Sequence, residues 1–140
     1  MRFKIRSIVL LVFALGYCLG VVGAGAQTIQ RANTDIALKN GESMEFMDLY
    51  LISTDCRSLL IGLPDVEIME GPPGVSVAAK PAKIVPRAHS CANAISGGKL
   101  TISASGVEEY SRSTMVLRVT YKTRSGDRPR AYHIRLTLFP

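Results

Sequence analysis

The sequence predicts an all-β domain that is closed by one disulfide and preceded by an export signal. Apolar and polar residues alternate over much of residues 35–140, which is the period of a β-strand rather than of a helix. This region holds an even pair of cysteines, Cys56 and Cys91. The chain starts with a basic, then an apolar, then a small-residue segment, the order that secretory signal peptides follow.

Residues 1–26 are interpreted as a cleavable signal peptide. Its first residues carry three cations and no acid, and an uncharged apolar run follows. Ala24 and Ala26 occupy the two positions that a signal peptidase reads, which predicts cleavage after Ala26, with Ala24 as the alternative. The mature protein is therefore expected in the periplasm or outside the cell.

Two other readings of this segment stay open. The uncharged residues 8–26 are nearly long enough to span a bilayer, so the signal could be retained as an anchor. Membrane contact is expected only in that case. Cys18 could carry a lipid, although the bulky Tyr17 stands where lipoproteins have a small residue.

Removal of the signal changes what the composition implies. It takes away three of the 17 basic residues and none of the 11 acidic ones, so the net charge falls from +6 to about +3. It also removes the odd cysteine, Cys18. Cys56 and Cys91 are then predicted to form a structural disulfide, because they lie far apart and lack the C-x-x-C spacing of redox-active pairs.

The mature chain is expected to form about seven to nine strands in one domain, residues 35–140, after an N-terminal arm, residues 27–34. Asn40-Gly41 predicts a hairpin turn, and Gly97-Gly98 predicts a turn before another strand. The expected strands are residues 35–38, 43–52, 66–70, 75–79, 83–85, 100–104, 115–122 and 132–138. Their number and spacing fit an immunoglobulin-like antiparallel β-sandwich without the usual tryptophan, and a small closed barrel is the alternative.

Several short segments together resemble a group of small exported proteins from Gram-negative soil bacteria. The resemblance covers nearly the whole mature chain and implies export, a β fold and a periplasmic location, with no assigned activity. The segments that carry it are Cys56-Arg57-Ser58-Leu59-Leu60, Pro64, Glu70-Gly71-Pro72-Pro73, Val85-Pro86-Arg87, Cys91, Gly97-Gly98, Tyr121-Lys122-Thr123, Gly126-Asp127-Arg128 and Leu138-Phe139-Pro140.

Catalytic and metal-binding patterns are weak in this sequence, so neither an enzyme nor a cofactor is expected. The chain has no G-x-S-x-G motif, and its two histidines, His89 and His133, belong to no recognisable triad. Met44, Met69 and Met115 could in principle bind copper, but they occupy positions expected in the core. A weak metal carrier is therefore a less favoured alternative, and an enzyme is the least favoured function.

The last two strands carry the best functional candidates. From residue 112 to the end, the sequence has seven basic residues and one acid, Asp127. Arginine forks suit carboxylate and phosphate oxygens, so the predicted function is non-enzymatic binding of an anionic envelope component or a protein partner. Nucleic acid is not expected, because aromatic residues do not interleave with the cations. The predicted binding residues are Arg118, Lys122, Arg124, Arg128, Arg130, His133 and Arg135. The alternatives are a solvated sheet face and a structural or stress-related envelope protein without a ligand.

Overall fold

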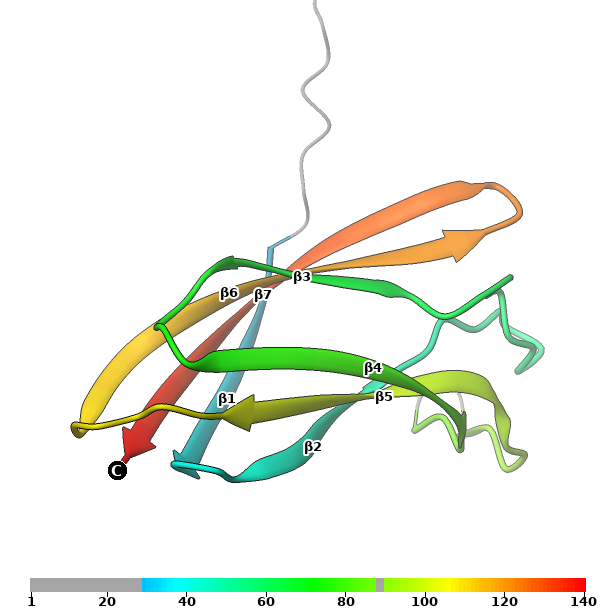
Figure 1. Cartoon of the computed structure of the whole chain (residues 1–140). Helices are drawn as coiled ribbons and strands as arrows, with labels where there is room; N and C mark the ends of the chain where they lie inside the picture. Colours follow the sequence, from blue (N-terminus) through cyan, green and yellow to red (C-terminus); the bar gives the residue numbers. More distant parts are fainter. Residues whose placement is uncertain (1–28, 88–89) are drawn as a thin grey trace, which may run out of the picture.

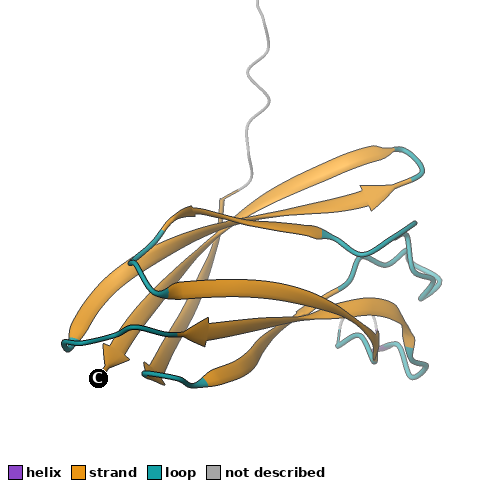
Figure 2. Ribbon diagram, viewed as in Figure 1, coloured by secondary structure: helices purple, strands orange, loops and turns teal. Residues whose placement is uncertain are grey.

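The structure, a computed structural model, describes residues 29–87 and 90–140. These residues form seven strands. Figure 1 shows the strands stacked as two facing sheets, and Figure 2 shows that turns and loops connect them. The described residues contain no α-helix. The strands are β1 (Ile29–Lys39), β2 (Ser43–Leu49), β3 (Asp65–Glu70), β4 (Val75–Ile84), β5 (Ile95–Ala104), β6 (Ser111–Thr123) and β7 (Gly126–Phe139).

The two sheets are unequal in size. One has four strands in the order β1-β7-β6-β3, and the other has three in the order β2-β5-β4. All neighbouring strands are antiparallel except β1, which runs parallel to β7. The all-β prediction is confirmed, and the strand number lies within the predicted range.

The hairpin of β6 and β7 forms the centre of the larger sheet. Its arms are in continuous register from Ser111↔Leu138 to Thr123↔Gly126, which leaves Arg124 and Ser125 as a two-residue turn. One face of each arm is buried, as the alternation predicted. This burial fixes the register, because a slip of one residue would put arginines into the core. The buried apolar residues are Met115, Leu117, Val119 and Tyr121 in β6 and Tyr132, Ile134, Leu136 and Leu138 in β7.

The predicted disulfide is confirmed between Cys56 and Cys91, with an S–S distance of 2.00 Å and a Cα–Cα distance of 5.7 Å. Cys56 lies in the β2–β3 loop, and Cys91 lies in the β4–β5 loop. Figure 1 shows these two loops and the β6–β7 turn at the same end of the sandwich, on the right of the view. The disulfide therefore joins two of the three connections at that end.

Two turn predictions need correction. The Asn40-Gly41 turn forms, with Gly41 at φ 82°, but it joins β1 to β2 in the opposite sheet and is not a hairpin. Gly97 and Gly98 lie within β5 rather than in a turn. Close packing is the reason, since a Cβ on Gly97 would lie 2.5 Å from the carbonyl oxygen of Leu49.

The predicted N-terminal arm also needs correction. Ile29 pairs with Ala131 and Gln30 with Tyr132, and after a register shift Thr34 pairs with Ile134, so residues 29–34 belong to the sheet. The sequence did not show this, because an edge strand can be held by backbone pairing without apolar alternation. The proposed signal peptide, its cleavage site, Cys18 and His89 lie outside the described residues.

The methionines divide into core and surface. Met115 is fully buried, as expected, whereas Met44 is 38% exposed and Met69 is 51% exposed. Met69 falls at a β-bulge, where the register between β3 and β6 shifts between Ile68 and Glu70. Met69 follows the alternation of β3, since it lies on the same exposed face as Asp65 and Glu67, so the expected core position was wrong for Met69 and for Met44.

Candidate functional site

Three of the predicted binding residues lie on the outer face of the larger sheet, but each is paired with a carboxylate from a neighbouring strand. The shortest distances are 2.6 Å for Arg118–Glu67, 2.8 Å for Lys122–Asp65 and 2.5 Å for Arg135–Asp35. The Arg135 pair is bidentate, with a second contact of 2.9 Å. These pairs cancel most of the positive charge on this face, so it is not the open basic surface that the sequence predicted.

The register of the sheet explains the pairing. Glu67 lies directly opposite Arg118 across β3 and β6, and Asp35 lies opposite Arg135 across β1 and β7. Side chains directly opposite one another on the same face are close enough to interact. The nearby Asp65 raises the pKa of Lys122 by accepting a hydrogen bond and by its charge.

Three further residues of the hairpin lie apart from one another. Arg112 is at the far end of the hairpin from the turn, with its guanidinium carbon 5.9 Å from the centre of the Tyr110 ring. Arg130 is half-buried, and its guanidinium carbon lies 5.6 Å from the centre of the Tyr121 ring. His133 is half-buried opposite Val116. The structure therefore does not bring these residues into one site with the turn.

Arg124 and Arg128 are exposed at the β6–β7 turn, and in the described part of the chain neither makes an ion pair. Arg128 Nη2 donates to Ser125 Oγ over 3.3 Å, and Ser125 Oγ lies 3.0 Å from Thr123 Oγ1. Thr123 Oγ1 donates to the Gly126 carbonyl over 2.7 Å. These hydrogen bonds order the turn, and they leave both arginines without a carboxylate partner among the described residues.

A cleft of about 840 Å³ lies between this turn and the β2–β3 loop. A hydrogen bond from the Ile61 N–H to the Lys122 carbonyl and a β-bridge between Leu60 and Thr123 attach the loop to β6. The cleft combines arginines, hydroxyl groups and aliphatic side chains. It is lined by Ser53, Asp55, Arg57, Ser58, Leu59, Leu60, Ile61, Thr123, Arg124, Ser125 and Arg128.

The cleft has a net charge of +2, because three arginines and one aspartate line it. The aspartate, Asp55, accepts a hydrogen bond from Ser53 and forms an ion pair of 3.0 Å with Arg57. The Ser53 hydrogen bond is the main cause that lowers the pKa of Asp55. The charge of Arg57 is therefore largely matched, and Arg124 and Arg128 supply the excess.

A buried polar contact stands behind the hairpin. The hydroxyl oxygens of Tyr121 and Tyr132 lie 2.9 Å apart. Burial, and then the hydrogen bond with Tyr132, strongly raise the pKa of Tyr121. The Tyr121 phenol is therefore held neutral inside the sandwich, and its contact with Tyr132 has a structural role.

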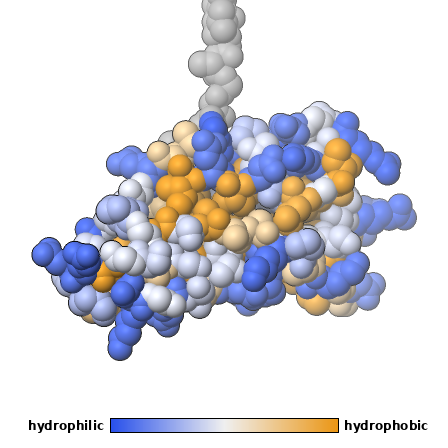
Figure 3. Space-filling view, viewed as in Figure 1, coloured by the Kyte–Doolittle hydropathy of each residue, from blue (hydrophilic) through white to orange (hydrophobic). Residues whose placement is uncertain are grey.

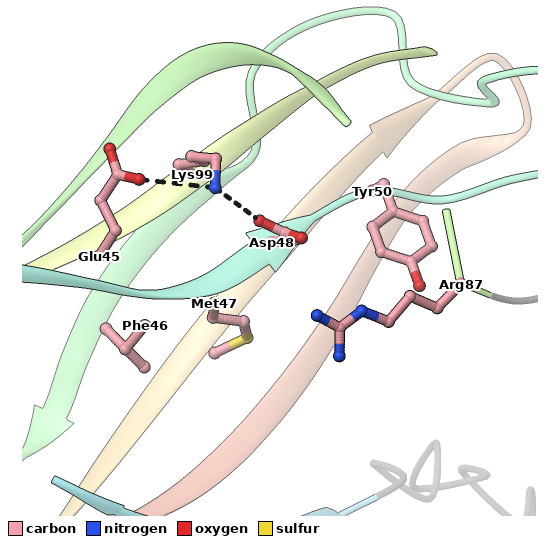
Figure 4. A pocket seen from close by; sticks show the side chains of 7 residues that line it. All are labelled: Glu45, Phe46, Met47, Asp48, Tyr50, Arg87 and Lys99. Carbon is pink, nitrogen blue, oxygen red and sulfur yellow. Dashed lines mark ion pairs between the residues drawn. The ribbon is translucent and has the colours of Figure 1, made fainter. Parts of the chain in front are cut away.

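A second cleft, of about 450 Å³, lies beside β2 and contains a lysine, Lys99, between two carboxylates. Figure 4 shows its ammonium group facing both, at 3.5 Å from Glu45 and 3.3 Å from Asp48. The hydrogen bond with Asp48 is the main cause that raises the pKa of Lys99. Arg87 also lines this cleft, so its two basic and two acidic residues balance, and it is less suited to an anion than the cleft at the hairpin turn, which has a net charge of +2.

A third surface is apolar. Figure 3 shows a strip of hydrophobic side chains along the edge of the sandwich where β3 and β4 face each other. The half-buried residues of this edge are Val66, Ile68, Val75, Val77 and Ala79, and the exposed Met69 adjoins them. The strip carries no titratable group, so it offers a packing surface and no binding chemistry for an anion.

No family model, curated protein or solved structure matches this chain. Among residues 29–87 and 90–140, no three His, Cys, Asp or Glu side chains are grouped as a metal ion would require. The same residues contain no helix long and apolar enough to cross a membrane. The cleft between the β6–β7 turn and the β2–β3 loop is the candidate functional site, because its lining has an excess of positive charge.

Proposed function

We propose that the mature chain is an exported, non-enzymatic β-sandwich module that binds an anionic component of the cell envelope at the cleft beside the β6–β7 turn. One observation carries the proposal: Arg124 and Arg128 retain their charge in a cleft, whereas Arg118, Lys122 and Arg135 are paired with carboxylates. The bound group is a phosphate or a carboxylate, because guanidinium forks match both in geometry and in charge.

An immunoglobulin-like topology is part of this proposal. The order β2-β5-β4 in one sheet and β3-β6-β7 in the other corresponds to that of the seven-stranded immunoglobulin sandwich. The first strand differs in place, since β1 lies beside the last strand in the larger sheet. Sandwiches of this kind commonly bind partners through the loops at one end, which is where the cleft lies.

The disulfide supports export. A structural disulfide persists in an oxidising compartment, and the Cys56–Cys91 bond also holds the β2–β3 loop that forms one wall of the cleft. Together with the basic and apolar start of the sequence, this supports a periplasmic or secreted protein after cleavage near Ala26.

Binding without catalysis is part of this proposal. Nucleophilic hydrolysis needs a base within hydrogen-bond reach of a nucleophile. Within the described residues, His133 makes no hydrogen bond to a serine or to a carboxylate. The acid of the cleft, Asp55, is already held by Ser53 and Arg57, which favours a positioning role.

Binding of the purified mature protein to lipopolysaccharide and to peptidoglycan tests the proposal. We expect saturable binding that weakens as salt screens the charges, and a loss of about tenfold or more in Arg124→Ala/Arg128→Ala. Arg118→Ala/Arg135→Ala is the matched control, because it removes the same charge from the paired outer face. If the turn variant binds as tightly as the natural chain, the proposal is wrong.

A structural envelope protein without a ligand is the second candidate. The three matched ion pairs of the outer face favour it, because they are typical of a solvated sheet surface. Under this alternative, deleting the protein weakens the envelope and the Arg124→Ala/Arg128→Ala chain restores it in full. Under the binding proposal, that variant fails to restore it.

A further inference from the structure

We infer that the end of the sandwich that carries the cleft docks on the surface of a bilayer that contains anionic phospholipids. This inference rests on the proposed anion binding and goes further by naming the partner. The sequence predicted membrane contact only through a retained signal segment. The structure adds exposed aliphatic side chains beside Arg124 and Arg128, in the lining of the same cleft.

The aliphatic side chains are Leu59 and Ile61, which line the cleft and are 38% and 63% exposed. Alternation along the β2–β3 loop explains their exposure: Leu60 between them packs on the core and bridges to Thr123, so its two neighbours face outward. Exposing an isoleucine to water costs free energy, and that cost is recovered if the side chain enters an apolar phase when the protein binds.

The same end has further residues of both kinds. Val85, which is 56% exposed, and the exposed Arg87 follow the end of β4. Figure 1 places this segment at the end that also holds the β2–β3 loop and the β6–β7 turn, and Figure 3 shows apolar and hydrophilic side chains side by side there. Aliphatic side chains at the tip with arginines around them suit a surface whose headgroups are anionic and whose interior is apolar.

The charge of the site argues against a neutral surface. The cleft carries a net charge of +2, and arginines near an anionic membrane strengthen binding, whereas a zwitterionic membrane gives them little attraction. An anionic vesicle should therefore bind the protein, and a neutral vesicle should not.

Co-sedimentation with vesicles tests the inference. The two preparations are phosphatidylcholine alone and an equal mixture of phosphatidylcholine and phosphatidylglycerol. We expect binding to the mixture only. Leu59→Ser/Ile61→Ser should weaken it about tenfold, because two exposed aliphatic side chains no longer enter the apolar layer. Arg124→Ala/Arg128→Ala should weaken it roughly thirtyfold.

Two controls separate this inference from the proposed function. Met69→Ser removes an apolar side chain whose exposure, 51%, lies between those of Leu59 and Ile61, and it should bind like the natural chain. Binding of dispersed lipopolysaccharide and of inorganic phosphate should survive in Leu59→Ser/Ile61→Ser and fall in Arg124→Ala/Arg128→Ala. Urea denaturation of every variant verifies that it is folded.

A spectroscopic measurement supplies independent evidence. The chain has no tryptophan, so Ile61→Trp introduces a single fluorescent reporter at the proposed contact. Its emission should shift to shorter wavelength with the anionic vesicles and stay unchanged with the neutral ones.

The outcomes distinguish the two ideas. If only the arginine variant loses vesicle binding and the tryptophan emission of the Ile61→Trp variant does not shift, the membrane inference is wrong and anion binding stands. If neither double variant changes binding of vesicles or of soluble anions, both are wrong. Soluble anions bound without any vesicle binding would also overturn the membrane inference.

Discussion

Removing the disulfide should lower the free energy of unfolding by roughly 4 kcal/mol. Cys56 and Cys91 are 35 positions apart, and the entropy of closing a loop of that length in the unfolded chain gives this value at 25 °C. Alanine is the better replacement, because Cys91 is buried and a serine hydroxyl there would need a new partner. The variant is therefore Cys56→Ala/Cys91→Ala.

Urea denaturation measures this loss. With a slope of roughly 1.5 kcal/mol per molar urea for a domain of this size, the midpoint should fall by about 2.7 M. Reduction of the natural chain should bring it to the midpoint of the variant, and reductant should leave the variant unchanged. Equal midpoints for the oxidised natural chain and the variant would refute the reasoning, because the bond would then not restrict the unfolded state.

Three other changes test the packing described above. Gly97→Ala should cost about 1–3 kcal/mol in urea denaturation, because its Cβ meets the Leu49 carbonyl oxygen and one backbone must move. Tyr121→Phe should cost about 1–3 kcal/mol, since it leaves the Tyr132 hydroxyl buried without its partner. Because the fold raises the pKa of Tyr121, the stability that the Tyr121 phenol contributes is complete below about pH 10 and is lost above that, as the phenol of the unfolded chain ionises. Between about pH 8 and about pH 11, the free energy of unfolding should therefore fall more in the natural chain than in Tyr121→Phe. Asp35→Asn should cost no more than about 1 kcal/mol, since its ion pair is exposed.

The elements that the sequence predicted best are those with the longest alternation. β6 and β7 keep period two over most of their length, so their faces and their register followed from the pattern. The pairing of Cys56 with Cys91 followed from counting. Backbone pairing decided the rest: residues 29–34 join β7 as an edge strand, and Gly97 lies in a strand because another backbone passes close to it.

The candidate site was predicted in part. The cations near the end of the chain are evident from composition, and Arg124 and Arg128 were among the predicted binding residues. The sequence around these cations includes only one acid. The carboxylates that pair with Arg135 and Arg118 come from Asp35 and Glu67, which lie 100 and 51 positions earlier in the chain. Which strands flank a hairpin is a matter of topology that local pattern does not encode.

The other wall of the cleft was missed for a related reason. Arg57, Leu59 and Ile61 lie in the β2–β3 loop, which shows no pattern that links it to the end of the chain. One signal could have found it. The disulfide prediction placed Cys56 in a restrained loop, so its neighbour Arg57 was a candidate for a fixed position on the surface.

The most direct test of the central claim compares the affinities of two variants that each lose two positive charges, one at the turn and one on the outer face. The affinity for lipopolysaccharide is measured at increasing salt for the natural chain, Arg124→Ala/Arg128→Ala and Arg118→Ala/Arg135→Ala. We predict that the turn variant loses about tenfold or more at low salt and depends less on salt, while the outer-face variant stays within about twofold of the natural chain. Equal losses in the two variants would contradict the account, because net charge rather than the cleft would then govern binding.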